Sequence, residues 1–361
     1  MADTITALVQ RNKGKSLVQE QIPKPKPGAH QLLVKISHVA QNPTDVQALD
    51  SNALGDGAVL GCDFVGTVEE IGDKVTKKNK GDVVAGLIWG GEIYGLGAYS
   101  EATLADESIS FKIPSSVSRA EAATVPLAAA TAQLALFSEN CLNLDRNSAK
   151  NMPVLIWGGS SSVGLYALQL LRLNSFSPII TTCSPHNNSL VQSAGAHIIH
   201  DHSAEHIDDT IAEIRRQAPN LRYVFDTIGS VESSSIASRA LSDEGGTLVT
   251  VRPGKANTGG VKTGTDVRDV LVWTAFEREV RYGEFVWPMY SLRLTNILLL
   301  QPNKKDHDLV AEFFEKMPAY LEEGSIKPSR VKSKKGLEAV EEGFKEHREG
   351  KISGYKIVYS I

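Results

Sequence analysis

A glycine-rich turn is the segment whose residue types and spacing most clearly indicate chemistry. It reads GGSSSVG at residues 158–164. The apolar residues 154–157 before it read as a buried strand, and the leucines after it recur at helical spacing. A strand, a tight turn and a helix start place free backbone N–H groups and a positive helix end against a phosphate. The turn predicts a dinucleotide site, in which Gly158 and Gly159 approach the pyrophosphate and Gly164 brings the helix close to the strand.

The end of the second strand in this region bears on the choice between NADH and NADPH. An NAD site usually carries Asp or Glu there, about 20 residues after the glycines, for the ribose 2′-OH. No acidic residue occurs between Val154 and His200, and the strand at 179–182 is followed by Ser184, His186 and Asn187. Hydroxyl, imidazole and amide groups do not repel a 2′-phosphate, so we expect NADPH to be preferred. Alternatively, Ser184 and Asn187 cap the next helix. That role is compatible with a preference for NADPH.

Composition limits the classes of protein. A chain of 361 residues suggests two domains, and 42% hydrophobic with 22% charged residues is ordinary for a soluble protein. A net charge of −4 gives no basic excess for nucleic acid. The three cysteines, Cys62, Cys141 and Cys183, are too far apart for a disulfide framework or a cysteine zinc lobe. Without a signal sequence or an apolar run long enough to span a bilayer, we expect a cytoplasmic protein with no membrane partner.

The chain contains two regions that differ in their predicted order of strands and helices. Residues 1–126 are β-rich, with strands at 5–9, 32–36, 64–71 and 82–87. After a helix at 126–137, strands at 154–157, 179–182, 198–200, 223–226 and 247–251 alternate with helices at 164–172, 187–194, 204–217 and 233–241. The tail contains helices at 309–323 and 336–348 and a strand at 355–360. We predict an α/β protein in which a doubly wound parallel sheet (127–301) interrupts a β-rich domain formed by 1–126 and 302–361.

Motifs in both regions resemble the medium-chain dehydrogenase/reductase superfamily over essentially the whole chain. They are NPTD (42–45), GCDFVG (61–66), GAYSE (97–101), the glycine turn and the closing GKISGYKIV (350–358). Within the superfamily, TCSPHN (182–187) and IGSVES (228–233) most resemble the zinc-free enoyl reductases of fungi, which include free-standing enzymes that work with polyketide synthases. The resemblance implies a Rossmann domain and a GroES-like domain formed by both termini.

The resemblance also implies metal-free chemistry. Zinc-dependent members carry Cys where this chain has Asn42, His where it has Cys62 and Glu where it has Asp63, together with a lobe of four cysteines that is absent here. Zinc requires such thiolate or imidazole ligands. We therefore expect NADP(H)-dependent reduction of the C=C bond of an enone, enal or enoyl thioester in a cleft between the domains. The hydride reaches the β-carbon, the carbonyl takes enolate charge and a proton then reaches the α-carbon.

Site residues follow from the same resemblance. The cofactor-binding residues it implies are Asp45, Gly158, Gly159, Ser160, Ser161, Ser162, Val163, Gly164, Ser184, Pro185, His186, Asn187, His202, Val249, Thr250, Ile352 and Ser353. Thr131 stands where a family threonine approaches nicotinamide and substrate, or alternatively bonds back to its own helix turn. Gln47 stands where the fungal enzymes usually have lysine. Because an amide supplies neither charge nor a proton, water is the expected proton source.

Several alternatives remain open from the sequence. A quinone or aldehyde reductase has the same fold, and Gln47 is also compatible with a non-catalytic nucleotide-binding or partner-binding protein. For the reductase, we expect a small unsaturated carbonyl substrate, either free or bound to a carrier or synthase, and a monomer or a homodimer. Trp273, Trp287 and Tyr290 either line the substrate cleft or pack in the interior. The histidines at 197, 200, 202 and 206 are interpreted as surface imidazoles rather than metal ligands, and the basic run 332–335 as a solvated approach to a helix.

Overall fold

The computed structural model describes the chain except for residues 1–2, 231, 252–258, 279, 283–297 and 301. It divides into two compact units, Met1–Leu127 with Trp273–Ile361, and Ala128–Val272. The first boundary lies one residue after the predicted one, whereas the second lies at Val272 rather than at residue 301. Trp273 stacks on Trp89 at a ring distance of 4.4 Å, which places the chain after Val272 in the first unit.

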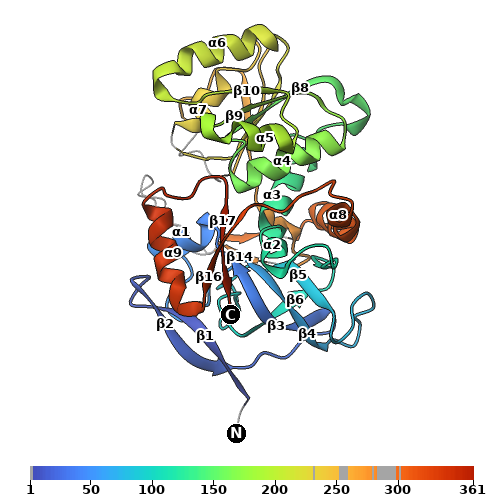
Figure 1. The fold of residues 1–361 in the computed structure, drawn as a ribbon, viewed down its shortest axis with the longest axis vertical. Coiled ribbons are helices and arrows are strands. Elements are labelled where there is room, and N and C mark those ends of the chain that lie inside the picture. The colour runs from blue at the N-terminus through green and yellow to red at the C-terminus, as the bar shows by residue number, and fades with distance from the viewer. Residues whose placement is uncertain (1–2, 231, 252–258, 279, 283–297, 301) are drawn as a thin grey trace. The chain divides into compact units, whose positions relative to one another are not determined.

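The second unit is a six-stranded parallel sheet whose order is β10-β9-β8-β11-β12-β13 (Figure 1). Its strands are β8 (Lys150–Trp157), β9 (Ser177–Thr182), β10 (Ile198–His200), β11 (Tyr223–Asp226), β12 (Gly246–Thr250) and β13 (Thr265–Asp269). Its helices are α4 (Ser162–Leu173), α5 (Asn188–Ala194), α6 (Ile207–Gln217) and α7 (Ser233–Ser238). Numbered along the chain, the strands run 3-2-1-4-5-6, which is the Rossmann order. The predicted parallel sheet is confirmed, and its order reverses between β8 and β11.

Alternation along β8 explains how both faces of this sheet are covered. Leu155 and Trp157 belong to an apolar core that includes Ile211 and Ile214 of α6 and Ala237 of α7. The alternate residues of β8 project from the opposite face, where α4 contacts β8 and β9 and packs against α5. Both faces are therefore apolar and covered, as a buried parallel sheet requires.

The first unit is built around a seven-stranded sheet of order β16-β17-β3-β4-β5-β7, with β6 also paired to β3. The N-terminal elements are β1 (Thr4–Arg11), β2 (Ser16–Pro23), β3 (Gln31–Ala40), α1 (Pro43–Ser51), β4 (Asp63–Ile71), β5 (Val83–Leu87), β6 (Ala102–Asp106), β7 (Ser110–Lys112), α2 (Arg119–Ala123) and the start of α3 (Pro126–Phe137). The C-terminal elements are β14 (Val280–Tyr282), β15 (Leu298–Leu300), α8 (Lys304–Glu322), β16 (Val331–Lys335), α9 (Val340–Arg348) and β17 (Lys356–Ser360). Because β17 pairs antiparallel with β3, both ends of the chain contribute to one sheet, which confirms the predicted β-rich domain.

Elements that the sequence did not predict include α1 and β16. Helix α1 begins after Asn42 with a capping box, in which the Asn42 N–H donates to Asp45 Oδ2 at 2.8 Å, and with Pro43 in the first turn. The basic run 332–335 lies in strand β16, which pairs in parallel with β17. One described helical stretch, Arg119–Phe137, is long and apolar enough to cross a membrane, but 89% of its apolar window is buried. A core helix passes the same test, so this is weak evidence for a span.

Candidate active site

The three glycine positions of the turn after β8 have no room for a side chain. Gly158 has φ +81°, a left-handed conformation that favours glycine. A Cβ on Gly159 would lie 2.0 Å from Thr181 Oγ1, and one on Gly164 would lie 2.6 Å from the carbonyl oxygen of Gly158. Glycine is therefore required at each of the three positions for a different steric reason. At Gly164 it allows the first turn of α4 to lie against the loop.

The start of α4 presents backbone donors beside this turn. Ser161 is the N-cap, and its Oγ accepts the Gly164 N–H at 2.9 Å. The first backbone bond of the helix runs from Leu165 N–H to the Ser161 carbonyl at 2.9 Å, so the N–H groups of Ser162 and Val163 precede the helical ladder. Two donors at a positive helix end form a cradle that fits a pyrophosphate.

The loop after β11 adds residues that the sequence analysis did not assign to the site. The Ser161 hydroxyl donates to Thr227 Oγ1 at 2.8 Å, which joins the ends of β8 and β11 where the strand order reverses. Buried Asp226 accepts the N–H groups of Ile228 and Gly229 at 3.0 and 3.2 Å. Ile228 is 48% exposed, which is unusual for a large apolar residue at this edge. The sequence signal was an Asp-Thr pair at the end of a predicted strand.

The ends of β9 and β10 bring residues together that were predicted to bind the adenosine phosphate, with His202, which was predicted to flank the adenine, beside them. Ser184 Oγ lies 3.3 Å from His202 Nε2, and His186 Nε2 lies 3.2 Å from Asn187 Nδ2. Neither Ser184 nor Asn187 uses its side chain as a helix cap, although both occupy N-cap positions. Capping therefore does not account for these side chains.

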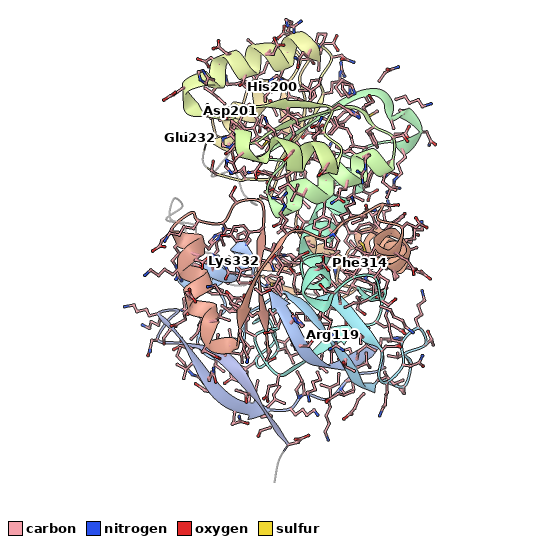
Figure 2. All side chains as sticks on the ribbon, in the orientation of Figure 1. Arg119, His200, Asp201, Glu232, Phe314 and Lys332 are labelled. Carbon is pink, nitrogen blue, oxygen red and sulfur yellow. The ribbon has the colours of Figure 1, made fainter. Side chains whose placement is uncertain are left out.

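Asp201, labelled in Figure 2, directly follows β10. It is the first acidic residue in the sequence after the end of β9. Its carboxylate accepts the Ser203 N–H at 3.0 Å and the Ser203 hydroxyl at 3.1 Å. Burial acts to raise the pKa of Asp201, but the bonds from Ser203 outweigh it and the pKa is lowered. Asp201 is thus committed to a local turn.

In the first unit, a buried ion pair joins three elements. Lys356 Nζ of β17 donates to Asp63 Oδ2 at 2.6 Å and to Asn42 Oδ1 at 2.8 Å. Asn42 Nδ2 donates to the same Asp63 oxygen at 2.9 Å, and Asp63 Oδ1 accepts the Leu127 N–H at 2.6 Å. Lys356 and Asn42 are 3% exposed, and Asp63 is fully buried. The sequence predicts a closing strand that contains Lys356, but no sequence pattern indicates this pairing.

Asp45, predicted to contact the cofactor, lies beside this ion pair and is itself buried. Its Oδ2 accepts the Asn42 N–H of the capping box and the Tyr99 hydroxyl at 3.1 Å. Burial and, to a smaller extent, the nearby Asp63 charge raise the pKa of Asp45 to about 7, although these hydrogen bonds act to lower it. A cofactor contact by Asp45 stays a prediction, because the observed contacts are structural.

The donor set at Asn42, Cys62 and Asp63 does not fit a zinc ion. The Lys356 ammonium already occupies the Asn42 and Asp63 oxygens, and its positive charge would repel a dication. Burial, followed by the charge of Asp45, raises the pKa of the Cys62 thiol, which disfavours the thiolate that zinc requires. Among the described residues, no group of three or more His, Cys, Asp or Glu side chains could hold a metal.

The other predicted residues lie in their separate units. Gln47 is half-buried in α1, and Thr131 is 9% exposed within α3. Val249 and Thr250 end β12 and are buried. Two more, Ile352 and Ser353, precede β17, where Ile352 packs against the core of the first unit and Ser353 is exposed. Their roles remain predictions.

The remaining candidates from the sequence separate into different environments. His197 Nδ1 accepts the Ile179 N–H, and His200 bonds to Gln217, so these imidazoles do not converge. Lys332 of β16 (Figure 2) pairs with Glu346 at 2.9 Å, which neutralises part of the basic run. Trp287 and Tyr290 lie outside the described residues.

Comparisons with known proteins identify relatives in sequence and in fold. Residues 28–115 match the alcohol dehydrogenase GroES-like domain. A trans-enoyl reductase of Gibberella fujikuroi is 30% identical over 98% of this chain and 99% of that protein. A zinc-type alcohol dehydrogenase-like protein of Schizosaccharomyces pombe is 30% identical over 94% of each chain. The crystal structure of CurK enoyl reductase matches with a TM-score of 0.74 at 18% identity, covering 99% of both chains. The chain belongs to the medium-chain dehydrogenase/reductase superfamily of oxidoreductases, among its enoyl reductase-like members.

Proposed function

We propose that this protein is an NADPH-dependent reductase of the C=C bond in α,β-unsaturated carbonyl compounds. Support for a nicotinamide dinucleotide comes from the glycine turn, whose glycine positions have no room for a Cβ and which lies where the order of the sheet reverses. Support for the alkene as the reacting bond comes from relatives named trans-enoyl reductases, which match the chain over nearly its whole length.

The acid-free end of β9 is the observation that carries the choice of NADPH. Ser184 and His202 lie 3.3 Å apart there, exposed His186 follows, and neither Ser184 nor Asn187 is used as a cap. A hydroxyl and imidazole groups can donate to a phosphate, whereas a carboxylate at this position would repel it. Asp201 accepts two bonds from Ser203, which supports its assignment to a local turn rather than to the carboxylate of an NAD site.

The residues of this chain would divide the work of the reaction as follows. The N–H groups of Ser162 and Val163 would hold the pyrophosphate, and Ser184 and His202 would hold the 2′-phosphate. The reduced nicotinamide supplies the hydride. The Gln47 amide can donate a hydrogen bond to a carbonyl oxygen as enolate charge develops there, but it cannot release a proton, so water protonates the α-carbon.

We further propose that no metal takes part. The support is the chemistry of the donor set, in which the Lys356 ammonium holds the oxygens of Asn42 and Asp63 and the Cys62 thiol is disfavoured as a thiolate. Activity that survives exhaustive chelation, with no stoichiometric zinc in the active protein, is the expected result. A requirement for zinc would contradict this part of the proposal.

The decisive experiment follows NADPH and NADH oxidation with a matched enal, saturated aldehyde, quinone and enoyl thioester, and identifies the products. We expect saturation of the C=C bond of the enal or thioester, with a higher kcat/KM for NADPH. Turnover of the saturated aldehyde or of the quinone alone would assign the protein to one of the alternative reductases. Tight NADPH binding without turnover of any substrate would indicate a non-catalytic protein.

A further inference from the structure

The buried ion pair of the first unit is a costly arrangement that fold stability alone does not explain. We call Lys356, Asp63 and Asn42 the Lys356 cluster. Its lysine and aspartate side chains are 3% and 0% exposed and their atoms lie 2.6 Å apart. Removing each charge from water costs several kcal/mol, and well-packed apolar residues of similar volume often give equal or greater stability. We therefore ask which side chains the cluster holds in position.

The contacts of the cluster show which groups it places. Asn42 is the N-cap of α1, and the Lys356 ammonium holds its side-chain oxygen at 2.8 Å. Gln47 lies in the same short helix, one turn further along. The position of the Gln47 amide therefore depends on how the start of α1 is held.

The same cluster fixes a second helix start. Asp63 Oδ1 accepts the N–H of Leu127, the second residue of α3, at 2.6 Å, so a carboxylate lies at the positive end of that helix. Thr131 lies one turn beyond Leu127 in α3. Asp63 can hold this donor as a charged acceptor because Lys356 neutralises it.

A third segment ends at the cluster. Ile352 and Ser353 precede Lys356 by only a few residues, and the Lys356 N–H is fixed by the Arg330 carbonyl at 2.8 Å. The three segments that carry Gln47, Thr131 and the pair Ile352 and Ser353 thus share one buried anchor.

We propose that Lys356, through its bonds to Asp63 and Asn42, is a positioning residue for hydride transfer that fixes the starts of α1 and α3. This inference rests on the proposed reductase function. Lys356 acts through other residues, and it is not required to touch substrate or cofactor. Its removal is expected to lower kcat while leaving the phosphate contacts of NADPH intact, because the residues proposed for them follow β8, β9 and β10 in the second unit.

The test compares Lys356→Met, Asp63→Asn, the double variant and a matched control. Lys356→Met alone leaves a buried, unpaired carboxylate and is expected to destabilise the protein strongly. The double variant removes both charges while retaining volume, so its thermal unfolding is expected to return toward that of the wild type. The control is Lys334→Met on the neighbouring strand β16, whose lysine is 10% exposed and pairs with Glu342 and Glu346 at 2.9 and 3.0 Å.

For the double variant we expect kcat to fall by about 100-fold, the order expected when reacting groups are misplaced by about 1 Å. Its Kd for NADPH, measured by fluorescence titration, is expected to stay within about twofold of the wild type, since each tenfold corresponds to 1.4 kcal/mol. Lys334→Met is expected to retain full kcat. A stable double variant with wild-type kcat would overturn the proposal, as would a loss of NADPH affinity equal to the loss of kcat.

Hydrogen exchange gives a readout that does not depend on activity. In the double variant, the amides of α1 and of the first turn of α3 are expected to exchange faster, while those of α4 keep their wild-type rates. Unchanged exchange in α1 and α3 would overturn the anchoring role. If the wild-type protein reduces none of the substrates, the proposed function fails, and the exchange rates still decide whether the cluster anchors these helices.

Discussion

Substitution of Gly164 by alanine tests whether the glycine turn binds the cofactor. The added Cβ would lie 2.6 Å from the Gly158 carbonyl oxygen and 2.8 Å from Gly159 Cα, and both are backbone atoms. Ordinary contact distances require the first turn of α4 and the loop to separate by roughly 0.6–0.8 Å. The N–H groups of Ser162 and Val163 would move with the helix.

At the centre of each range, the free energies predict a larger loss of NADPH affinity than of stability. Hydrogen bonds from these two N–H groups to a pyrophosphate contribute about 1.5–3 kcal/mol each. Weakening both by about half costs roughly 1.5–3 kcal/mol, or about 10- to 150-fold in Kd. Overpacking costs the fold about 1–3 kcal/mol, and the gain in helix propensity offsets up to about 1 kcal/mol of this.

Fluorescence titration with NADPH and thermal unfolding measure the two effects of Gly164→Ala separately. Gly259→Ala is the matched control in the same unit, because a Cβ there meets no atom within 4 Å. It is expected to bind NADPH like the wild type. A folded Gly164→Ala protein whose Kd stays within about twofold of the wild type would refute the assignment of the turn to the cofactor.

Three further substitutions test other parts of the site. Ser184→Asp places a carboxylate beside His202 and is expected to raise the KM for NADPH by roughly 10- to 100-fold while affecting NADH less; an unchanged ratio of kcat/KM for the two cofactors would contradict the 2′-phosphate assignment. Ser161→Ala removes the N-cap of α4 and the bond to Thr227, so we expect a loss of about 1 kcal/mol in the free energy of unfolding together with weaker NADPH binding. Burial raises the pKa of Asp45 from 3.8 to about 7, so its neutral form contributes stability that is present at pH 4 and lost as pH rises through about 7. Thermal unfolding of Asp45→Asn between pH 4 and 8 is expected to show a flatter profile than the wild type, and parallel profiles would contradict the raised pKa.

The nucleotide-binding unit was the more predictable part of the chain. The strands at 198–200 and 223–226 have the bounds predicted from the sequence, because short apolar runs between helices leave little choice of position. Right-handed crossovers then restrict the order of such strands to few arrangements. The link between Ser161 and Thr227 was not predictable in the same way, because it depends on which strand ends become neighbours.

In the first unit, local patterns were less informative. The lysines of β16 suggested a solvated approach to a helix, but Lys334 lies in a strand with its side chain 10% exposed and paired with glutamates of α9. Long lysine side chains can lie along apolar surface while their charge finds a partner, so lysine content alone does not exclude a strand. The partners of Lys356 lie 293 and 314 positions away in the sequence, so no local pattern could indicate its burial.

Electrostatics connects the two buried aspartates of this unit. A low-dielectric interior opposes isolated charge, so each ionisable group there must be paired or neutral. Asp63 is paired with Lys356, whereas Asp45 has no cation among the partners that set its pKa and is driven toward its neutral form by burial and by the Asp63 charge. The sequence shows two aspartates of equal chemistry; the fold places one against a lysine and buries the other in surroundings whose net effect raises its pKa.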